Sequence, residues 1–311
     1  MIRILVTGAS GFLGSNVLLA AVDAGYHVTA TSHSRPIRAS GAQWKAADLT
    51  VEGAAAELIE ALQPEWIVHC AAAADVDRCE QDPDWAFALN RDMPAAVASA
   101  ASEFGSSLVY ISTDAVFGGE PGPHRESDPT NPINTYGESK LSGEQAVLAA
   151  NPRAAVVRTN FYGWSPPGRT SLAEWFLGKL RAGEPCNGFT DIQISPLLVN
   201  DLASALFRIL LASESGIWHL GCMGQFSKYE LGVRIAEVYD LDPSLIAPAE
   251  SHTMGLRAER PRDLSLDSQR AVQELGINLP PCDEGIRRFS VLEQAGYSDR
   301  LENLLVEPSR S

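Results

Sequence analysis

The segment "TGASGFLG", residues 7–14, follows the apolar stretch "RILV" and decides the fold. It lies between a predicted strand at 3–7 and a predicted helix at 12–24. In dinucleotide-binding folds the first glycine permits a tight turn, the second lets backbone N–H groups approach a pyrophosphate, and the third permits close packing of helix on strand. An ordinary strand-to-helix turn is the alternative. The segment predicts a nucleotide site at Gly8, Gly11 and Gly14.

Apolar runs and helical patterns alternate outward from this segment. Such alternation predicts a doubly wound parallel sheet, an α/β Rossmann fold over residues 1–160. The further strands are expected at 27–31, 66–70, 107–112 and 154–159, and the further helices at 52–62, 91–104 and 137–150.

The alternation of strand and helix patterns ends after Arg158. Helices are expected at 171–182, 200–212 and 227–239, with a short strand at 216–220. We predict that residues 161–311 mainly form a smaller substrate-binding domain, with a segment near 195–220 as a candidate to return to the sheet. The last dozen residues are expected to be loosely held.

Composition excludes several classes of protein. The 311 residues are 45% hydrophobic and 20% charged, as in globular proteins, and the net charge of −15 argues against nucleic-acid binding. No run of 18 apolar residues indicates a membrane span, and a strand at the first residues leaves no room for a signal peptide, so we expect a cytoplasmic protein. An odd number of cysteines without C-x-x-C spacing predicts buried thiols in a reducing compartment, without disulfide or metal site. They are Cys70, Cys79, Cys186, Cys222 and Cys282.

A tyrosine and a lysine stand four residues apart in "NTYGESK", residues 134–140. An ammonium near Tyr136 would lower the pKa of its phenol, and the pair would make a proton donor. The alternative is an exposed ring beside the aliphatic stem of Lys140. Thr113 ends a predicted strand at the edge where ligands bind in α/β sheets, and its hydroxyl could contact a carbonyl oxygen or a local backbone group.

These motifs together resemble the extended short-chain dehydrogenase/reductase family, over residues 1 to about 290, and its dTDP-4-dehydrorhamnose reductase subgroup. The resemblance rests on five stretches: "AAADVDRCEQDPDWAFALN" (72–90), "ISTDAVFGG" (111–119), "ESDPTNPINTYGESKLSGE" (126–144), "VVRT" (156–159) and "RPRDLSLD" (260–267). It implies Thr113, Tyr136 and Lys140 as catalytic residues and Asn90 in a proton relay, with helix capping as the alternative for Asn90.

The resemblance also implies sets of binding residues. The cofactor would be bound by Gly8, Gly11, Phe12, Leu13, Gly14, Ser32, His33, Arg35, Asp48, Leu49, Ala71, Ala72, Ala73, Tyr136 and Lys140. The substrate would be bound by Val76, Asp114, Asn160, Phe161 and Arg260, with Arg260 on its diphosphate or, alternatively, in a surface ion pair. The subgroup usually has a tryptophan where this chain has Phe161, with Trp164 a little later.

The end of the second strand bears on the cofactor. The stretch 28–38 contains no carboxylate that could bind ribose hydroxyls, whereas His33 and Arg35 could meet a phosphate. NADP(H) is therefore expected over NAD(H), with Arg35 as the main charge partner. A solvated basic loop is the alternative.

The resemblance implies an NADPH-dependent reductase of a nucleotide-activated 4-keto-6-deoxy sugar. Ala115 supports this, because the related 4,6-dehydratases have a second carboxylate there to eliminate water. The alternatives are a non-catalytic regulatory subunit similar to the methionine adenosyltransferase beta subunit, and an epimerase or dehydratase. The expected partner is a nucleotide sugar, and a homodimer remains open.

Overall fold

The computed structural model describes residues 1–304, and its centre is a seven-stranded sheet. The strand order is β11-β6-β5-β4-β1-β2-β3, and every neighbouring pair is parallel. Because the chain starts in the middle and winds outward in both directions, the predicted doubly wound Rossmann fold is confirmed. The strands are β1 (Arg3–Thr7), β2 (His27–Ser32), β3 (Ala42–Ala46), β4 (Trp66–His69), β5 (Ser107–Ile111), β6 (Ala155–Thr159) and β11 (Gly216–Leu220).

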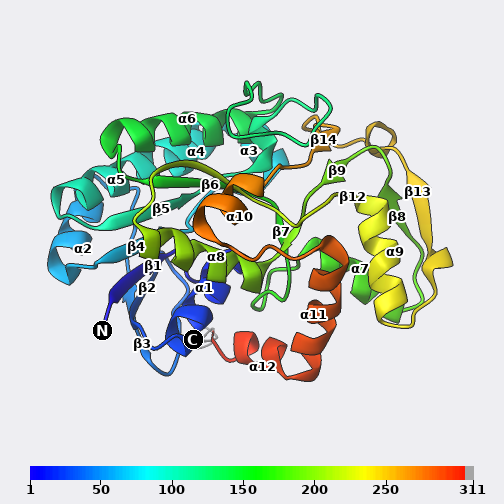
Figure 1. Cartoon of the computed structure of the whole chain (residues 1–311), viewed down its shortest axis with the longest axis horizontal. Helices are drawn as coiled ribbons and strands as arrows, with labels where there is room; N and C mark the ends of the chain where they lie inside the picture. Colours follow the sequence, from blue (N-terminus) through cyan, green and yellow to red (C-terminus); the bar gives the residue numbers. More distant parts are fainter. Residues whose placement is uncertain (305–311) are drawn as a thin grey trace.

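Helices cover both faces of this sheet (Figure 1). In β1, Ile4 and Val6 join one apolar cluster and Leu5 joins the other, as the alternation along a strand requires. The face of Leu5 is covered by α2 (Ala54–Leu62), α5 (Met93–Glu103) and α6 (Thr135–Ala150), and the opposite face by α1 (Phe12–Asp23) and α8 (Val199–Ala212). The helices predicted within residues 1–160 agree with α1, α2, α5 and α6 to within two residues at each end.

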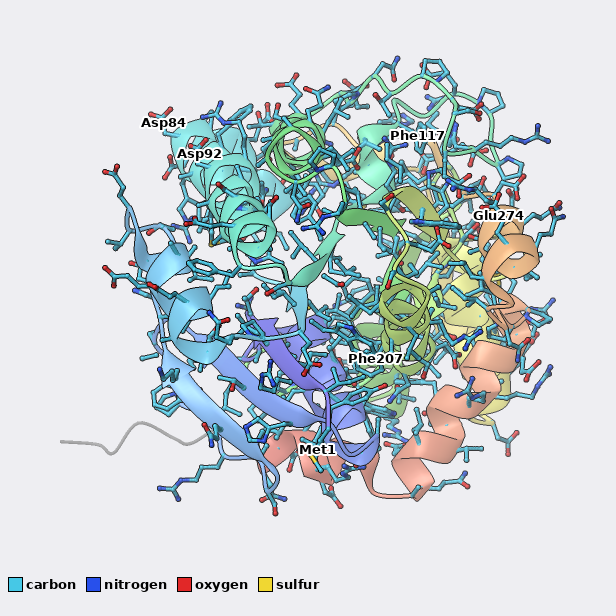
Figure 2. All side chains as sticks on the ribbon, turned by 60° about the vertical axis from the view of Figure 1, so that its left-hand side comes forward. Met1, Asp84, Asp92, Phe117, Phe207 and Glu274 are labelled. Carbon is cyan, nitrogen blue, oxygen red and sulfur yellow. A yellow bond between two sulfur atoms is a disulfide. The ribbon has the colours of Figure 1, made fainter. Side chains whose placement is uncertain are left out.

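Short helices that were not predicted connect β4 to α5. They are α3 (Val76–Gln81), α4 (Pro83–Phe87) and the π-helix η1 (Ala88–Asp92). The side chains of Asp75 and Asp82 cap α3 and α4 by accepting hydrogen bonds from backbone N–H groups. Charged side chains here lie at the surface, as Figure 2 shows for Asp84 and Asp92, whereas Phe117 and Phe207 are buried.

The later part of the chain forms small sheets and helices beside the central sheet, with β8, β13 and α9 on the right of Figure 1. Its expected strand at 216–220 is β11, which returns to the central sheet beside β6. The division into domains 1–160 and 161–311 stays a prediction. The remaining elements are β7 (Phe161–Tyr162), α7 (Leu172–Arg181), β8 (Cys186–Phe189), β9 (Gln193–Ile194), β10 (Leu197–Leu198), β12 (Phe226–Ser227), α9 (Lys228–Val238), η3 (Pro243–Leu245), β13 (Ile246–Ala249), η4 (Ser251–Met254), β14 (Asp263–Leu264), α10 (Gln269–Leu275), α11 (Cys282–Gln294) and α12 (Tyr297–Glu302), with η2 (Asp114–Val116) after β5.

The structure corrects the prediction about cysteines. Cys222, just after β11, and Cys282, the first residue of α11, form a disulfide across 60 residues of sequence. Neither spacing nor number could reveal it, because the pairing depends on where α11 packs. Cys79 and Cys186 are buried free thiols, as expected, whereas Cys70 is partly exposed.

The first residues of the predicted loose segment are better held than expected. Leu301 and Leu304 are buried, and the backbone N–H of Arg38 donates to the Leu304 carbonyl. Residues 305–311 of the predicted loose segment lie outside the described residues. No helix within residues 1–304 is long and apolar enough to cross a membrane.

Candidate active site

A cavity of about 520 Å³ lies at the carboxyl ends of β1, β2 and β4. It brings together eight of the residues predicted to bind a cofactor: Gly8, Gly11, Ser32, His33, Asp48, Leu49, Ala71 and Ala72. The predicted Phe12, Leu13, Gly14, Arg35, Ala73, Tyr136 and Lys140 are not among its lining residues. The cavity therefore lies at the nucleotide-binding edge that the first glycines predicted.

The glycine-rich turn has the geometry that its sequence predicted. Gly8 adopts φ +64°, and a Cβ there would lie 2.6 Å from the backbone nitrogen of Ala71 on the neighbouring strand end. A Cβ on Gly14 would overlap the Gly8 carbonyl, so α1 packs against the turn only with glycine at that position. No side chain caps α1 at Gly11, so its first N–H groups are available to an anion. These features fit a dinucleotide pyrophosphate.

Sequence reasoning missed several residues of this cavity, including Ser10, Thr31, Trp85 and Arg169. Arg169 belongs to the loop between β7 and α7, where its N–H donates to the Pro166 carbonyl and Gly168 has φ +78°. The Ser165 hydroxyl donates to the Arg169 carbonyl at 3.0 Å and fixes the turn. No local signal marks this arginine, since it reaches the cavity from a loop more than 150 residues after the glycine-rich turn in the sequence.

Arg35, the predicted charge partner of the cofactor, has a different contact. Its Nη1 donates to the Pro167 carbonyl at 3.4 Å, on the same loop that carries Arg169. The Ser32 hydroxyl donates to the Arg35 carbonyl at 2.5 Å, so the chain turns sharply after β2. His33 lies 3.4 Å from Asp48, whose pKa is lowered mainly by hydrogen bonds from Thr50.

A second cavity, of about 190 Å³, gathers most of the predicted catalytic and substrate residues. Asp114 and Ala115 reach it from η2 and Thr113 from just before η2, while Tyr136 comes from α6 and Asn160 from the end of β6. Val76 and Arg260 also line it. Phe161 is not among the lining residues and packs instead against Phe12, with ring centroids 5.2 Å apart. Trp164 is buried, and its Nε1 donates to the Phe289 carbonyl.

Asp114 is the buried carboxyl of this cavity. The Thr113 hydroxyl donates to it at 3.0 Å and Asn160 Nδ2 at 2.7 Å. Burial raises the pKa of Asp114 to about 6, against these hydrogen bonds. The Thr113 oxygen also accepts the Ala115 N–H at 3.2 Å, which is the local backbone contact weighed as its alternative role. Thr113 is therefore held in place by the two residues that follow it.

Tyr136 is positioned by the start of α6. Asn134 caps the helix by accepting the Gly137 N–H at 2.9 Å. A Cβ at Gly137 would overlap the Ala115 carbonyl, so glycine lets α6 approach η2 and brings Tyr136 beside Thr113. Burial raises the pKa of Tyr136 to about 12, and the Thr113 hydroxyl opposes this.

The predicted lowering of the Tyr136 pKa by Lys140 is wrong. Lys140 Nζ donates instead to the Tyr110 hydroxyl and the Ile111 carbonyl, each at 2.7 Å. Burial lowers the pKa of Lys140 to about 7, while Glu144 one helical turn later acts in the opposite direction. The desolvation of both side chains outweighs the attraction that the sequence spacing suggested.

The side chain of Asn90 caps no helix, so the capping alternative is wrong, whereas its part in a proton relay stays a prediction. Its amide accepts the Ala73 N–H at 2.9 Å and donates to the Ala73 carbonyl and the Ser139 hydroxyl at 3.0 Å. The Ser139 hydroxyl in turn donates to the Tyr136 carbonyl. Asn90 therefore braces the end of β4 against the first turn of α6, and it caps no helix.

Cationic side chains gather where the second cavity adjoins a third one. Arg260 Nη2 donates to Asp77 at 3.0 Å, so the ion pair weighed as its alternative role is present, although Arg260 also lines the cavity. Lys228, which sequence reasoning missed, lines it from the first residue of α9, and burial lowers its pKa. An adjoining cavity of about 350 Å³ shares Arg260 and adds Arg257 and Arg262. This end of the site suits an anionic group.

The model of the RmlD substrate-binding domain family matches residues 2–294. The chain is 31% identical to a probable low-salt glycan biosynthesis reductase of Haloferax volcanii, over 94% of this chain and 98% of that protein. It is 34% identical to dTDP-4-dehydrorhamnose reductase of Mycolicibacterium smegmatis, over 87% of this chain and 80% of that protein. It is 35% identical to methionine adenosyltransferase 2 subunit beta of Bos taurus, over 88% of this chain and 83% of that protein. Among solved structures it is similar to dTDP-4-dehydrorhamnose reductase from Bacillus anthracis in complex with NADP, with a TM-score of 0.84, 27% identity and 94% and 99% coverage.

Proposed function

Because the chain belongs to the RmlD substrate-binding domain family, within the extended short-chain dehydrogenase/reductases, we propose that it is an NADPH-dependent reductase of a nucleotide-activated 4-keto-6-deoxy sugar. One observation carries the proposal: Thr113, Tyr136 and Asp114 line a single cavity that opens beside cations. A dTDP-4-dehydrorhamnose reductase with NADP bound has the same fold. The chain is an oxidoreductase, and the sugar's identity belongs to the proposal.

The residues present fit a dinucleotide, since Gly8, Ser10 and Gly11 line the cavity and no side chain caps the start of α1. NADPH would supply the hydride. Ser10, Gly11 and α1 would bind its pyrophosphate, and Ser32, His33 and Arg169, with Arg35 in contact with the neighbouring loop, would bind its 2′-phosphate.

Tyr136 would donate the proton to the C4 oxygen, and Thr113 would hold that oxygen through a hydrogen bond. The raised pKa of Tyr136 keeps its phenol protonated at neutral pH, as a proton donor requires. Lys140 would bind the nicotinamide ribose, and Arg260 and Lys228 would bind the diphosphate. Ala115 offers no carboxylate at the place where a dehydratase needs one.

The decisive experiment offers NADPH with 4-keto-6-deoxy sugars carried on dTDP, UDP and GDP. We expect one NADPH consumed per sugar reduced at C4, and no loss of water from a nucleotide hexose that still bears its 6-hydroxyl. Mass spectrometry of both incubations measures this. Absence of hydride incorporation with all three nucleotides would overturn the reductase and favour a regulatory subunit, as the likeness to the methionine adenosyltransferase beta subunit allows. Light scattering of the purified chain tests whether it forms a homodimer.

The first residue-level test is Tyr136→Phe. We expect it to lower kcat by at least about a thousandfold while NADPH binding changes little, because the ring stays and only the proton donor is lost. Lys140→Ala should impair both. Fluorescence titration with NADPH and a steady-state assay separate these effects, and near-normal turnover by Tyr136→Phe would contradict its catalytic role.

A further inference from the structure

A buried chain of hydrogen bonds lies behind Lys140. Lys140 Nζ donates to the Tyr110 hydroxyl at 2.7 Å, and that hydroxyl donates to the Asn90 backbone carbonyl at 2.9 Å. The three residues are at most 2% exposed. With the bond to the Ile111 carbonyl, two of the three ammonium N–H groups have fixed partners, and the third is left for a ligand.

Three elements converge to build this chain. Tyr110 comes from β5, Lys140 from α6, and Asn90 from the π-helix η1, a rare geometry that often occurs at functional sites. At Gly143, α6 passes directly over the joint: a Cβ there would overlap the Asn90 carbonyl and lie 2.6 Å from the Tyr110 hydroxyl. The glycine therefore leaves room for the hydrogen bond between Tyr110 and Asn90.

Apart from Glu144, the titratable groups that face Lys140 are neutral, so its ammonium depends on neutral oxygen acceptors. At the end of β4, burial lowers the pKa of His69 to about 3, and burial raises the pKa of the Cys70 thiol just after the strand, so both are neutral. Cys79 on α3 is likewise a neutral thiol, since burial raises its pKa to about 11. Tyr136 on α6 is a protonated phenol.

The one carboxylate that affects the Lys140 pKa, Glu144, already has its own partners. It accepts bonds from Arg158 at 2.7 Å and Ser112 at 2.5 Å. The ammonium is thus held by two neutral oxygens and by the Tyr110 ring, whose centroid is 4.2 Å from Nζ.

Packing alone does not require the Tyr110 hydroxyl. Tyr162 is also buried, and its hydroxyl has no hydrogen-bond partner among the residues that the structure describes. The core therefore tolerates a tyrosine oxygen without a partner. The hydroxyl of Tyr110, by contrast, has both a donor and an acceptor.

We propose that Tyr110 is a positioning residue for Lys140: its hydroxyl, anchored on the Asn90 carbonyl, holds the ammonium charged and turns its remaining N–H toward the nicotinamide ribose. This rests on the proposed function, because it assigns Lys140 to a bound cofactor. Tyr110 acts through Lys140 and does not itself line the second cavity.

Tyr110→Phe tests the proposal. Loss of the acceptor should weaken NADPH binding about tenfold and lower kcat/KM by a similar factor, the usual size for a hydrogen bond to a charged group. Because the charged form of Lys140 loses support, its pKa should fall, and the alkaline limb of the pH profile of kcat/KM should move about one unit lower. The matched control, Tyr162→Phe, removes a hydroxyl without a partner and should change neither quantity.

A double-mutant cycle separates positioning from packing. In a Lys140→Met background, Tyr110→Phe should change NADPH affinity less than about twofold. An equal loss in both backgrounds, or a wild-type affinity and pH profile for Tyr110→Phe, would overturn the proposal. Gly143→Ala, which disturbs the same hydroxyl from α6, should reproduce the loss of affinity. NADPH titration needs no sugar, so the cycle judges Tyr110 even if every sugar reduction fails and the proposed function falls.

Discussion

At the scale of single residues, Arg35 and Arg169 are both candidates to bind the 2′-phosphate of NADPH. Arg35 follows β2, where the sequence placed the recognition of a 2′-phosphate, but its guanidinium contacts the Pro167 carbonyl. Arg169, two residues further along that loop, lines the cofactor cavity together with Ser32 and His33. A phosphate placed between them could engage both, although Arg169 alone reaches the cavity wall.

We therefore expect Arg169→Ala to raise the dissociation constant of NADPH about tenfold and to leave that of NADH within about twofold, since only NADPH has the extra phosphate. Arg35→Ala should have a smaller effect, exerted through the loop. Calorimetric titration of both variants with both cofactors measures this. A large loss for Arg35→Ala together with none for Arg169→Ala would return the main role to Arg35.

Asp114 should make stability depend on pH. Its pKa in the folded protein is about 6, above the ordinary value of 3.8, so folding favours the protonated carboxyl. This contribution is complete below about pH 4 and is lost as pH rises through about 6. Relative to Asp114→Asn, the wild type should lose about 2 kcal/mol of unfolding free energy between pH 4 and pH 8. Urea unfolding of both proteins at each pH gives the difference, and a difference independent of pH would contradict a raised pKa.

At the scale of elements, α6 carries both Tyr136 and Lys140, and its position depends on small residues. Gly137 lies against the Ala115 carbonyl, and Gly143 against the Asn90 carbonyl. The buried ion pair of Glu144 with Arg158 ties the helix to β6. Glycine has a low helix propensity, but a larger residue at either position would push the helix away from the strand ends.

Two glycine substitutions test this role of α6. Gly137→Ala should destabilise the protein by about 1–3 kcal/mol and lower kcat, because the new methyl would displace Tyr136 from Thr113. Gly178→Ala in α7 is the matched control: it is exposed, and its Cβ would meet nothing within 4 Å. The control should stabilise the protein by about 0.5–1 kcal/mol with unchanged kcat. Thermal unfolding and a steady-state assay distinguish the two, and equal effects would refute the packing argument.

At the scale of the whole molecule, positive charge is concentrated in one region of an acidic protein. The chain carries a net charge of −15, yet Lys228, Arg257, Arg260 and Arg262 gather around the outer cavities. Lys228 comes from α9 and the three arginines from the segment before β14, so folding brings the lysine to a group of arginines that are already close in sequence. An anionic substrate is thus attracted locally by a protein that is acidic overall.

The Cys222–Cys282 disulfide joins the exit of the central sheet to α11. It closes a long loop, and reduction should therefore lower the unfolding free energy by about 2–4 kcal/mol. A melting temperature several degrees lower in dithiothreitol is the expected result. Cys222→Ser should show the lower temperature in either condition and no response to dithiothreitol. A wild-type melting curve unaffected by reductant would contradict a stabilising role.

The sequence by itself determined the Rossmann half and the nature of its chemistry. Strand and helix periodicity, the glycines of residues 7–14 and the strand-end Thr113 are local signals, because they reflect backbone geometry within one turn or one strand. The same is true of Tyr136 and Lys140, whose separation on a helix is fixed by its pitch. The second cavity accordingly gathers six of the residues that the sequence proposed for the site: Val76, Thr113, Asp114, Tyr136, Asn160 and Arg260.

Only the tertiary structure decided which partners these residues have. Lys140 donates hydrogen bonds to the Tyr110 hydroxyl and the Ile111 carbonyl and not to Tyr136, because the buried ammonium bonds to the nearest oxygens. Arg169, Lys228 and the Cys222–Cys282 pair come from segments far apart in sequence, and their meeting depends on how the later elements pack against the sheet. Periodicity and spacing describe a segment and its immediate neighbours, whereas desolvation and long-range contacts depend on the whole packed chain.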